Sequence, residues 1–528
     1  MVKLFSGVNP KILLILFTLA FIGIVSMLFA TSLGIGISTD SIVYIDSARL
    51  LASGHGYVTK VYCGIEQPVI KWPPLFPNLL SILQIVGLDP LDGARWLNVL
   101  LFGANILLIG LLLYNFTKKS FYIPILGSLL ILTSTVMVDI HSMAWTEPLF
   151  IFLGFMGLFL LTLYVQNNSL IYLIAGSISI SLAYLDRYMG NTLVVAGIIG
   201  ILFLSQKKRY RRFLDSLVFL TISVSPIALL LIRNHQLTGY PVGNRTRQPF
   251  AVEQLDHILM SASSWLFPGS EIFTIFPAQD LVIKALFIAV FLILLIIGIR
   301  LLSKKPIQDR KKLIKTHLAN TPFLFLIFFI VYLALVITAV VFLDGSVGFD
   351  NRILSPAYVS ALILVLYLLH TFFHSGIKRS LQITLIIIGA AFAVMYLAAA
   401  TAWITYSHFN GRQYSNKTWQ GLEISKQLQS VSANTLIFSN YHEFVYFQTG
   451  RPACPIESVN QILSSGAQLQ FEPDNSVLVH FDIQPKYPFK NEREPESSVL
   501  AGLEKQFSLQ PIVKRPNLSI YRVSSKFN

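Results

Sequence analysis

The sequence predicts a polytopic α-helical membrane protein that carries a small extracytoplasmic α/β domain at its C-terminal end. Only 12% of the 528 residues are charged and 54% are hydrophobic, and the mean hydropathy is +0.65. Soluble domains carry about 25% charged residues. Apolar runs long enough to cross a bilayer follow one another up to residue 406, and the composition turns polar from residue 407. These observations exclude a soluble globular protein.

The first apolar run, residues 12–34, follows Lys3 and Lys11 and is long enough to span a bilayer. No small-residue cleavage site stands out after it, so we expect a retained signal anchor. With the ten runs that follow, eleven transmembrane helices are expected. The ten are residues 93–115, 121–139, 148–166, 170–186, 189–206, 213–233, 280–302, 321–343, 353–373 and 380–406.

Basic residues between these runs predict the orientation. Lys118-Lys119, residues 207–212, residues 304–315 and Lys378-Arg379 share one side if the N-terminus lies there too. Positive loops mark the cytoplasmic face. We therefore expect an integral plasma membrane protein with a cytoplasmic N-terminus. The chain has 40 basic and 26 acidic residues, and the basic clusters in the loops orient the protein in the membrane. We therefore expect membrane lipids as partners and no nucleic acid.

Residues 74–88 are apolar but too short to cross, and counting them as a span would invert every later loop. We expect them to lie along the outer leaflet or dip into it. Residues 36–92 then form one large exterior loop of a transmembrane domain, residues 1–406.

Residues 407–528 are expected to form the exterior α/β domain. An amphipathic helix is expected at 416–430. Strand-like apolar segments at 435–439, 476–481 and 518–523 follow it.

Acidic residues mark the candidate catalytic site. Asp40 follows the first span, and Glu147 precedes a later one in Trp145-Thr146-Glu147-Pro148. Each could be catalytic, or could simply stabilise a helix N-terminus, where Ser38, Thr39 or Ser41 could replace Asp40. Asp350 shares the exterior face with both, which favours a joint site.

Lys71, Arg187, Arg233 and Arg352 are cations at exterior helix ends. Singly, each could be an interfacial side chain that reaches toward water. Together they suit an anionic phosphate group. Asp186-Arg187 and Asp350-Arg352 could instead be internal ion pairs.

Several other signals are weaker. His141 could be a metal ligand or a core histidine. Cys63 and Cys454, the only cysteines, are both expected outside, where a disulfide is permitted, but no spacing rule supports their pairing. No Walker or HExxH motif occurs.

The order of these motifs resembles the type C (GT-C) membrane glycosyltransferases, in particular relatives of the protein mannosyltransferases and lipid A aminoarabinose transferases. The matching order is Asp40, Tyr44, Ala48, Gly54, Pro73-Pro74, Glu147-Pro148, Arg187, Arg352 and the tail around residues 439–451. Trp72, which separates Lys71 from Pro73, departs from the pattern, as does Ser41 after Asp40.

The resemblance implies transfer of a sugar from a polyprenyl-phosphate donor to a protein, lipid or glycan acceptor, with inversion. It implies Asp40 as the general base and Glu147 as a second acidic residue of the site. It implies that Lys71, Arg187 and Arg352 bind the donor phosphate. Tyr44, His141 and Asp350 are further site candidates. We expect Asp40, Lys71 and Arg352 to face one exterior cavity.

The sugar transfer that the resemblance implies needs no cofactor. A carboxylate removes the proton of the acceptor hydroxyl as that hydroxyl attacks the anomeric carbon. The departing phosphate is stabilised by cations and needs no separate acid. No divalent metal is required, although an acidic pair could recruit one.

Two other classes use similar residues. A transporter or flippase predicts inverted repeats and broken mid-membrane helices, and the sequence shows neither. The charges are also expected on one face and not at the midplane. A non-catalytic scaffold would bind a partner through its exterior domain and would not need Asp40 as a base.

The topology can be tested by labelling single cysteines from outside. A cysteine replacing Ser430 should react because it lies outside, and one replacing Lys208 should not. The reverse pattern would contradict the predicted orientation.

Overall fold

The computed structural model divides the chain into two compact units. The helical unit comprises Met1–Ser32, Ile70–Phe76 and Ala94–Phe409, and the sheet unit comprises Leu33–Val69, Pro77–Gly93 and Asn410–Asn528. The residues that the structure describes are 8–243, 253–268, 280–290, 292, 321–342, 350–375, 377–456, 475–483, 503–504 and 507–525.

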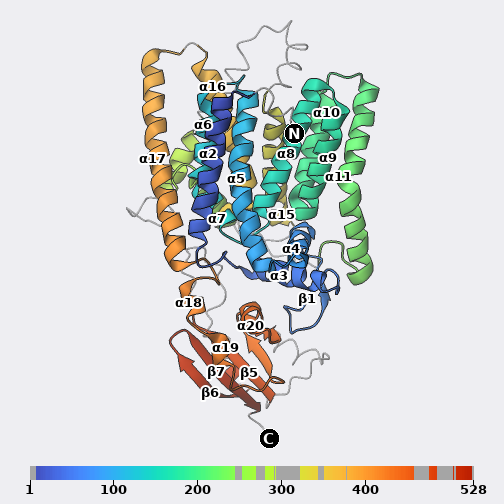
Figure 1. Ribbon diagram of the computed structural model, residues 1–528, viewed down its shortest axis with the longest axis vertical. Helices are drawn as coiled ribbons and strands as arrows, with labels where there is room; N and C mark the ends of the chain where they lie inside the picture. The colour runs from blue at the N-terminus through green and yellow to red at the C-terminus, as the bar shows by residue number, and fades with distance from the viewer. Residues whose placement is uncertain are drawn as a thin grey trace. The chain divides into compact units, whose positions relative to one another are not determined.

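Long apolar helices run alongside one another in the helical unit (Figure 1). Within the described ranges, six are long and apolar enough to cross a membrane: α2 (Pro10–Ala30), α5 (Pro90–Phe116), α8 (Glu147–Asn167), α11 (Arg209–Thr238), α16 (Asn351–Phe373) and α17 (Arg379–Asn410). Shorter apolar helices accompany them: α9 (Leu170–Asp186), η1 (Tyr188–Gly190) with α10 (Asn191–Leu204), and α15 (Phe323–Phe342).

The segment 121–139, expected as one straight span, is a bent pair. Helix α6 (Tyr122–Leu132) and helix α7 (Thr135–His141) meet at 56°. Thr133 ends the first helix, and the Ser134 hydroxyl accepts a hydrogen bond from the Met137 amide to cap the second. This local cap favours a new helix start over continuation of α6.

The other expected spans correspond to described helices, apart from residues 280–302, of which 291 and 293–302 lie outside the described residues. The count of eleven therefore stays a prediction. Helix α4 (Leu75–Ile85) has 11 residues and rises about 16 Å, well short of a bilayer core of about 30 Å. A location of 74–88 in the outer leaflet also stays a prediction.

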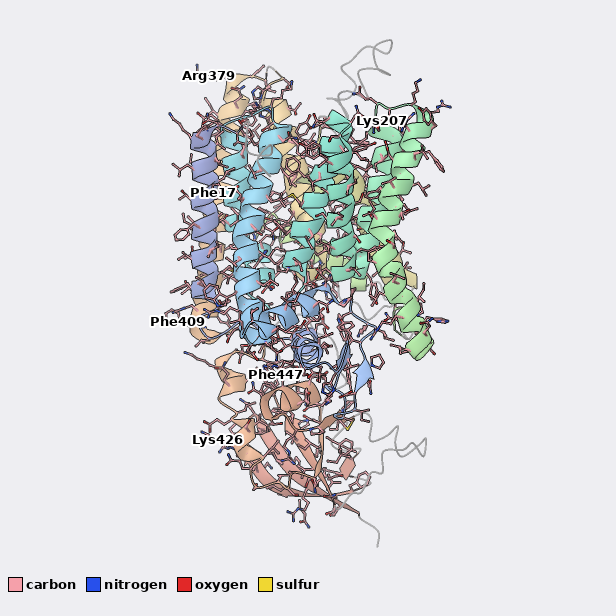
Figure 2. All side chains as sticks on the ribbon, turned by 45° about the vertical axis from the view of Figure 1, so that its right-hand side comes forward. Phe17, Lys207, Arg379, Phe409, Lys426 and Phe447 are labelled. Carbon is pink, nitrogen blue, oxygen red and sulfur yellow. A yellow bond between two sulfur atoms is a disulfide. The ribbon has the colours of Figure 1, made fainter. Side chains whose placement is uncertain are left out.

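The outward faces of the helical unit are apolar, as a lipid environment requires. Phe17 on α2 is 48% exposed and points outward (Figure 2). Figure 2 also shows Lys207 and Arg379 at one end of the helices and Phe409 at the opposite end of α17. An apolar girdle with a basic end is typical of an integral membrane protein.

Helices α8 and α9 approach closely because glycine occupies the crossing point. A Cβ on Gly157 would lie 2.6 Å from Cγ1 of Ile180, and one on Gly176 would lie 3.2 Å from the Gly157 carbonyl oxygen. Small residues allow membrane helices to pack this closely. The close crossing helps fix the starts and ends of α8 and α9, where the candidate site lies.

The sheet unit holds a mixed five-stranded sheet. Its order is β4-β3-β5-β7-β6, with β3 parallel to β4 and β5 and with β7 antiparallel to β5 and β6. Helix α20 (His442–Thr449) connects β3 to β4. The strands are β3 (Leu436–Ser439), β4 (Ala453–Pro455), β5 (Ser476–Phe481), β6 (Phe507–Arg515) and β7 (Leu518–Ser525).

The strands expected at 435–439, 476–481 and 518–523 are therefore observed. The helix expected at 416–430 is instead two short helices, α18 (Lys417–Gln420) and α19 (Ile424–Gln427). Glu423 between them has φ +46°, a left-handed conformation that a continuous α-helix does not contain. The single-helix prediction was wrong for this reason.

Residues 33–69 and 77–93 pack with this sheet as parts of the same unit. They contribute α3 (Thr39–Ala52) and a small antiparallel pair, β1 (Val58–Thr59) with β2 (Gln67–Pro68). The Tyr414 amide donates to the Ile37 carbonyl at 3.0 Å, and the Ser415 hydroxyl donates to that of Ile35 at 2.7 Å. The first long loop is thus folded into the C-terminal unit.

Replacing Gly157 by Leu should destabilise the protein by about 1–3 kcal/mol, since the new side chain overlaps Ile180. The measurement is thermal unfolding in detergent. Gly389→Leu on α17 is the matched control, because a Cβ there meets nothing within 4 Å. Equal melting temperatures for the two variants would contradict the α8–α9 crossing.

Candidate active site

One carboxylate and two guanidinium groups meet at the end of the helical unit where α8 and α16 begin and α9 ends. The Glu147 side chain is 1% exposed. Its Oε1 accepts hydrogen bonds from Nη1 of Arg187 and, at 2.7 Å, from Nε of Arg352. Residues 147, 187 and 352, far apart in the sequence, thus form one buried ion cluster, the Glu147 triad.

The local structure around α8 aims Glu147 inward. Glu147 is the first residue of α8, and Pro148 follows it, as suits the first helical turn. The Asn98 amide donates to the carbonyls of Met143 and Trp145, at 2.7 and 3.2 Å, and so holds the preceding turn in place. The carboxylate also lies at the positive end of the α8 dipole.

Arg352 is placed by the first turn of α16. The Asp350 carboxylate caps this helix, accepting from the Ile353 amide at 2.9 Å. Burial raises the pKa of Asp350 to about 6, although the Arg352 charge and this hydrogen bond oppose the rise. The Arg352 guanidinium stacks 4.3 Å from the centre of the Trp145 ring, which favours a planar cation. The observed role of Asp350 is therefore a helix cap beside the triad.

Asn351 ties the same turn to the helix α12 region. Its amide donates to the Ser264 hydroxyl at 2.9 Å, and its carbonyl oxygen accepts from the Trp265 indole at 3.1 Å. Both partners directly follow α12 (Glu253–Ser263). The contacts of Asn351 and the Asp350 cap together fix the turn that carries Arg352.

Arg187 lies in the short junction between α9 and η1. Besides Glu147, its Nη1 donates to the Thr146 hydroxyl at 2.8 Å. The neighbouring Tyr188 hydroxyl donates to the Ile70 carbonyl at 2.8 Å. That contact brings the segment carrying Lys71 to the junction that carries Arg187.

Lys71 itself is exposed, and its ammonium lies 5.1 Å from the centre of the Trp72 ring. Trp72, which interrupts the expected Lys-Pro-Pro order, is therefore the partner that orients the lysine. Arg233, the fourth cation, donates to its neighbour Asn234 at 3.0 Å. That Lys71 and Arg352 face one cavity stays a prediction.

Asp186 was not singled out as a site residue from the sequence. It is 1% exposed at the end of α9, and neither of its carboxylate oxygens has a hydrogen-bond partner among the described residues. Oε2 of Glu147 also has no hydrogen-bond partner among the described residues. The alternative of an Asp186-Arg187 ion pair is not seen among the described contacts, where Arg187 donates to Glu147 instead. Three buried acceptor atoms therefore lie at the two helix ends that form the triad.

In the sheet unit, Asp40 lies in the first turn of α3. Ser38 caps this helix in a capping box with Ser41, so the cap does not need Asp40. Asp40 is only partly buried. The sequence alternative in which Asp40 serves as the cap is thereby excluded.

Asp40 has Tyr62 and Glu443 in its surroundings. Burial, together with the charges of Glu443 and Asp40, raises the pKa of Tyr62 to about 12. The Tyr62 ring lies 5.6 Å from the His442 ring. Nothing in the sequence places residues 62 and 443 together, so reasoning from spacing missed both.

Two other residues of α3 are buried. Tyr44 is 2% exposed and belongs to the interior of the sheet unit. Asp46 is 8% exposed and accepts three hydrogen bonds, from Thr59, the Lys60 amide and Tyr446.

His141 is likewise buried in the helical unit. Its Nδ1 bonds to the Met137 carbonyl at 2.7 Å, and its Nε2 accepts from the Asn105 amide at 3.1 Å. Both ring nitrogens therefore have protein partners, and the core interpretation of this histidine holds. In the described part of the chain, no group of three or more His, Cys, Asp or Glu side chains could hold a metal ion.

No protein-family model matches the sequence, and no curated protein matches it by sequence. Solved structures do match its fold. A crystal structure of apo ArnT from Cupriavidus metallidurans aligns with a TM-score of 0.50 at 12% identity, over 96% of this chain and 97% of that one. A second crystal structure, of the same protein bound to undecaprenyl phosphate, aligns at 0.50 and 13%, over 97% and 98%.

Two further enzymes align more partially over their own length. The Archaeoglobus fulgidus oligosaccharyltransferase tethered to an acceptor peptide gives a TM-score of 0.56 at 12% identity, over 88% of this chain and 69% of that one. Arabinofuranosyltransferase AftD from Mycobacteria gives 0.53 at 14%, over 99% and 40%. These are GT-C glycosyltransferases, and the resemblance inferred from the sequence is confirmed at the level of the fold.

Glu147→Gln should destabilise the helical unit by about 3–5 kcal/mol, because it leaves Arg187 and Arg352 without their anionic partner. The measurement is thermal unfolding in detergent. Glu423→Gln is the matched control: that residue forms an exposed pair with Lys426, and exposed pairs contribute little. A Glu147 variant as stable as the control would contradict a buried triad.

Proposed function

We propose that the protein is an inverting membrane glycosyltransferase that uses a polyprenyl-phosphate sugar as its donor. The acceptor is a hydroxyl of a protein, lipid or glycan. The observation that carries the proposal is the Glu147 triad, set at one end of a helical unit with the GT-C fold. The ArnT structure with undecaprenyl phosphate and the oligosaccharyltransferase structure with an acceptor peptide support this substrate class.

The triad supports a site for an anionic leaving group. Glu147 takes one N–H from each arginine, and a guanidinium has five N–H donors in a rigid plane. Arg187 and Arg352 both face the Glu147 carboxylate. The hydrogen bond of Tyr188 holds the segment that carries Lys71 beside Arg187. Glu147 in this proposal orients the cations, and the cations bind the donor phosphate.

The reaction is a single displacement. Asp40 accepts the proton of the acceptor hydroxyl while that oxygen attacks the anomeric carbon. The bond between the anomeric carbon and the phosphate oxygen breaks, and polyprenyl phosphate leaves with the electron pair. The arginines and Lys71 stabilise the charge that develops on it. Use of a divalent metal is not part of the proposal.

The proposed topology places this chemistry outside the cell. Lys207 and Arg379 lie at the end of the helices opposite Phe409 (Figure 2), and a basic end favours the cytoplasm. The proposal includes eleven spans, a cytoplasmic N-terminus and an extracytoplasmic C-terminal domain. The Glu147 triad lies at the exterior end in this topology, at the depth of the lipid phosphates.

Asp40→Asn should fold normally, bind donor and lose transfer by a factor on the order of 10² or more, since an amide cannot take the proton. The assay is consumption of polyprenyl-phosphate hexoses by purified protein. Asp482→Asn, at an exposed position of the sheet unit, is the control. Turnover of the Asp40 variant at the parental rate would remove the base assignment.

Arg352→Ala should raise the apparent KM for the donor and lower kcat, because the phosphate loses a partner as its charge develops. Arg352→Lys should recover part of the loss, since it keeps the charge but not the planar fork. Donor kinetics unchanged in a folded Arg352→Ala variant would refute the phosphate role. A parent protein that moves a lipid-linked sugar across vesicles without transferring it would instead identify a flippase.

A further inference from the structure

The first exterior loop and the C-terminal segment are joined covalently within the sheet unit. Cys63 and Cys454, 391 positions apart, form a disulfide. The Cys63 amide also donates to the Ala453 carbonyl at 3.0 Å. The question that the sequence left open is therefore answered: the two cysteines pair. The loop that follows α3 is fastened to strand β4, directly after α20.

Asp46 forms a second connection, through α20. The Tyr446 hydroxyl donates to Asp46 Oδ1 at 2.8 Å. Oδ2 accepts from the Thr59 hydroxyl at 2.7 Å and from the Lys60 amide at 2.8 Å. A buried carboxylate is costly unless donors compensate it, so this arrangement is strongly preferred over one with an unpaired oxygen.

Packing between residues 39–64 and residues 442–452 extends beyond these bonds. The Arg49 guanidinium lies 5.8 Å from the centre of the Phe447 ring, a residue labelled in Figure 2. A Cβ on Gly64 would lie 2.7 Å from the Pro452 ring, so only glycine fits there. Figure 1 shows α20 between α3 and the sheet. Helix α3 thus contacts α20 through Asp46 with Tyr446 and through Arg49 with Phe447.

We propose that Tyr446 is a positioning residue for the transfer reaction: through Asp46 it holds the orientation of α3 and therefore of Asp40. Asp40 and Asp46 lie six residues apart on one rigid helix, so a carboxylate fixed at 46 fixes the direction of the one at 40. The inference rests on the proposed function, in which Asp40 is the base. It makes the C-terminal sheet a part of the catalytic framework.

The test is Tyr446→Phe, which removes one hydroxyl and keeps the ring. We expect kcat to fall about tenfold or more, because a misplaced base loses near-attack geometry. The donor KM should stay at the parental value, since the phosphate cations lie in the helical unit. Tyr521→Phe on β7, in the same sheet, is the matched control and should leave kcat unchanged.

Hydrogen exchange separates positioning from a general loss of structure. In Tyr446→Phe, exchange should quicken in residues 41–52 of α3 and stay slow in strand β5. In the double variant Cys63→Ser with Cys454→Ser, adding Tyr446→Phe should lower kcat further, since the connection to β4 and the connection to α20 are then both lost. Faster exchange throughout the sheet, with kcat lost in proportion to folded protein, would overturn the positioning role.

The kinetic outcomes are distinguishable. Transfer by the parent together with a parental kcat in Tyr446→Phe overturns this inference and leaves the proposed function standing. Absence of transfer by the parent with every polyprenyl-phosphate hexose overturns the proposed function and this inference with it. A fall in kcat at constant donor KM, confined to the Tyr446 variant, supports both.

Discussion

The buried carboxylate of Glu147 is the constraint on which the helical unit depends. A charge that is 1% exposed is tolerated only beside compensating groups, and Arg187 and Arg352 supply them. The elements that carry these three residues must therefore meet at one point. They are α8, the α9–η1 junction and α16. Trp145 beneath Arg352 and the Asn98 amide behind the preceding turn restrict that point further. The phosphate site that we propose is a consequence of the same arrangement.

The sheet unit obeys a similar rule with a different carboxylate. Asp46 is compensated by neutral donors, two from the loop after α3 and one from α20. A neutral hydroxyl or amide needs no second charge, so Asp46 is a structural anchor where Glu147 is part of a charged cluster. Asp40 differs from both, since it is only partly buried and the cap of α3 does not need it.

Reasoning from residue types identified Glu147, Arg187, Arg352 and Asp40 because charges are rare in an apolar chain and each stands beside a span. It also named Asp350 and His141 as further site candidates. The structure shows Asp350 as a helix cap and gives both His141 nitrogens core partners. Asp186 was passed over, although its place at a helix junction beside Arg187 was visible. These residues differ in their burial and in their partners in the folded protein, and the local sequence does not reveal either.

The sequence alone determined the apolar helices, their basic end and the strands near residues 436, 476 and 518, because these follow from local periodicity and composition. Only the tertiary structure decided which charges meet. Residues 147, 187 and 352, like 46 and 446, are far apart in the chain, and their pairing depends on how whole helices pack. The bend between α6 and α7 and the break at Glu423 were also decided there, since capping and a left-handed residue override an apolar pattern.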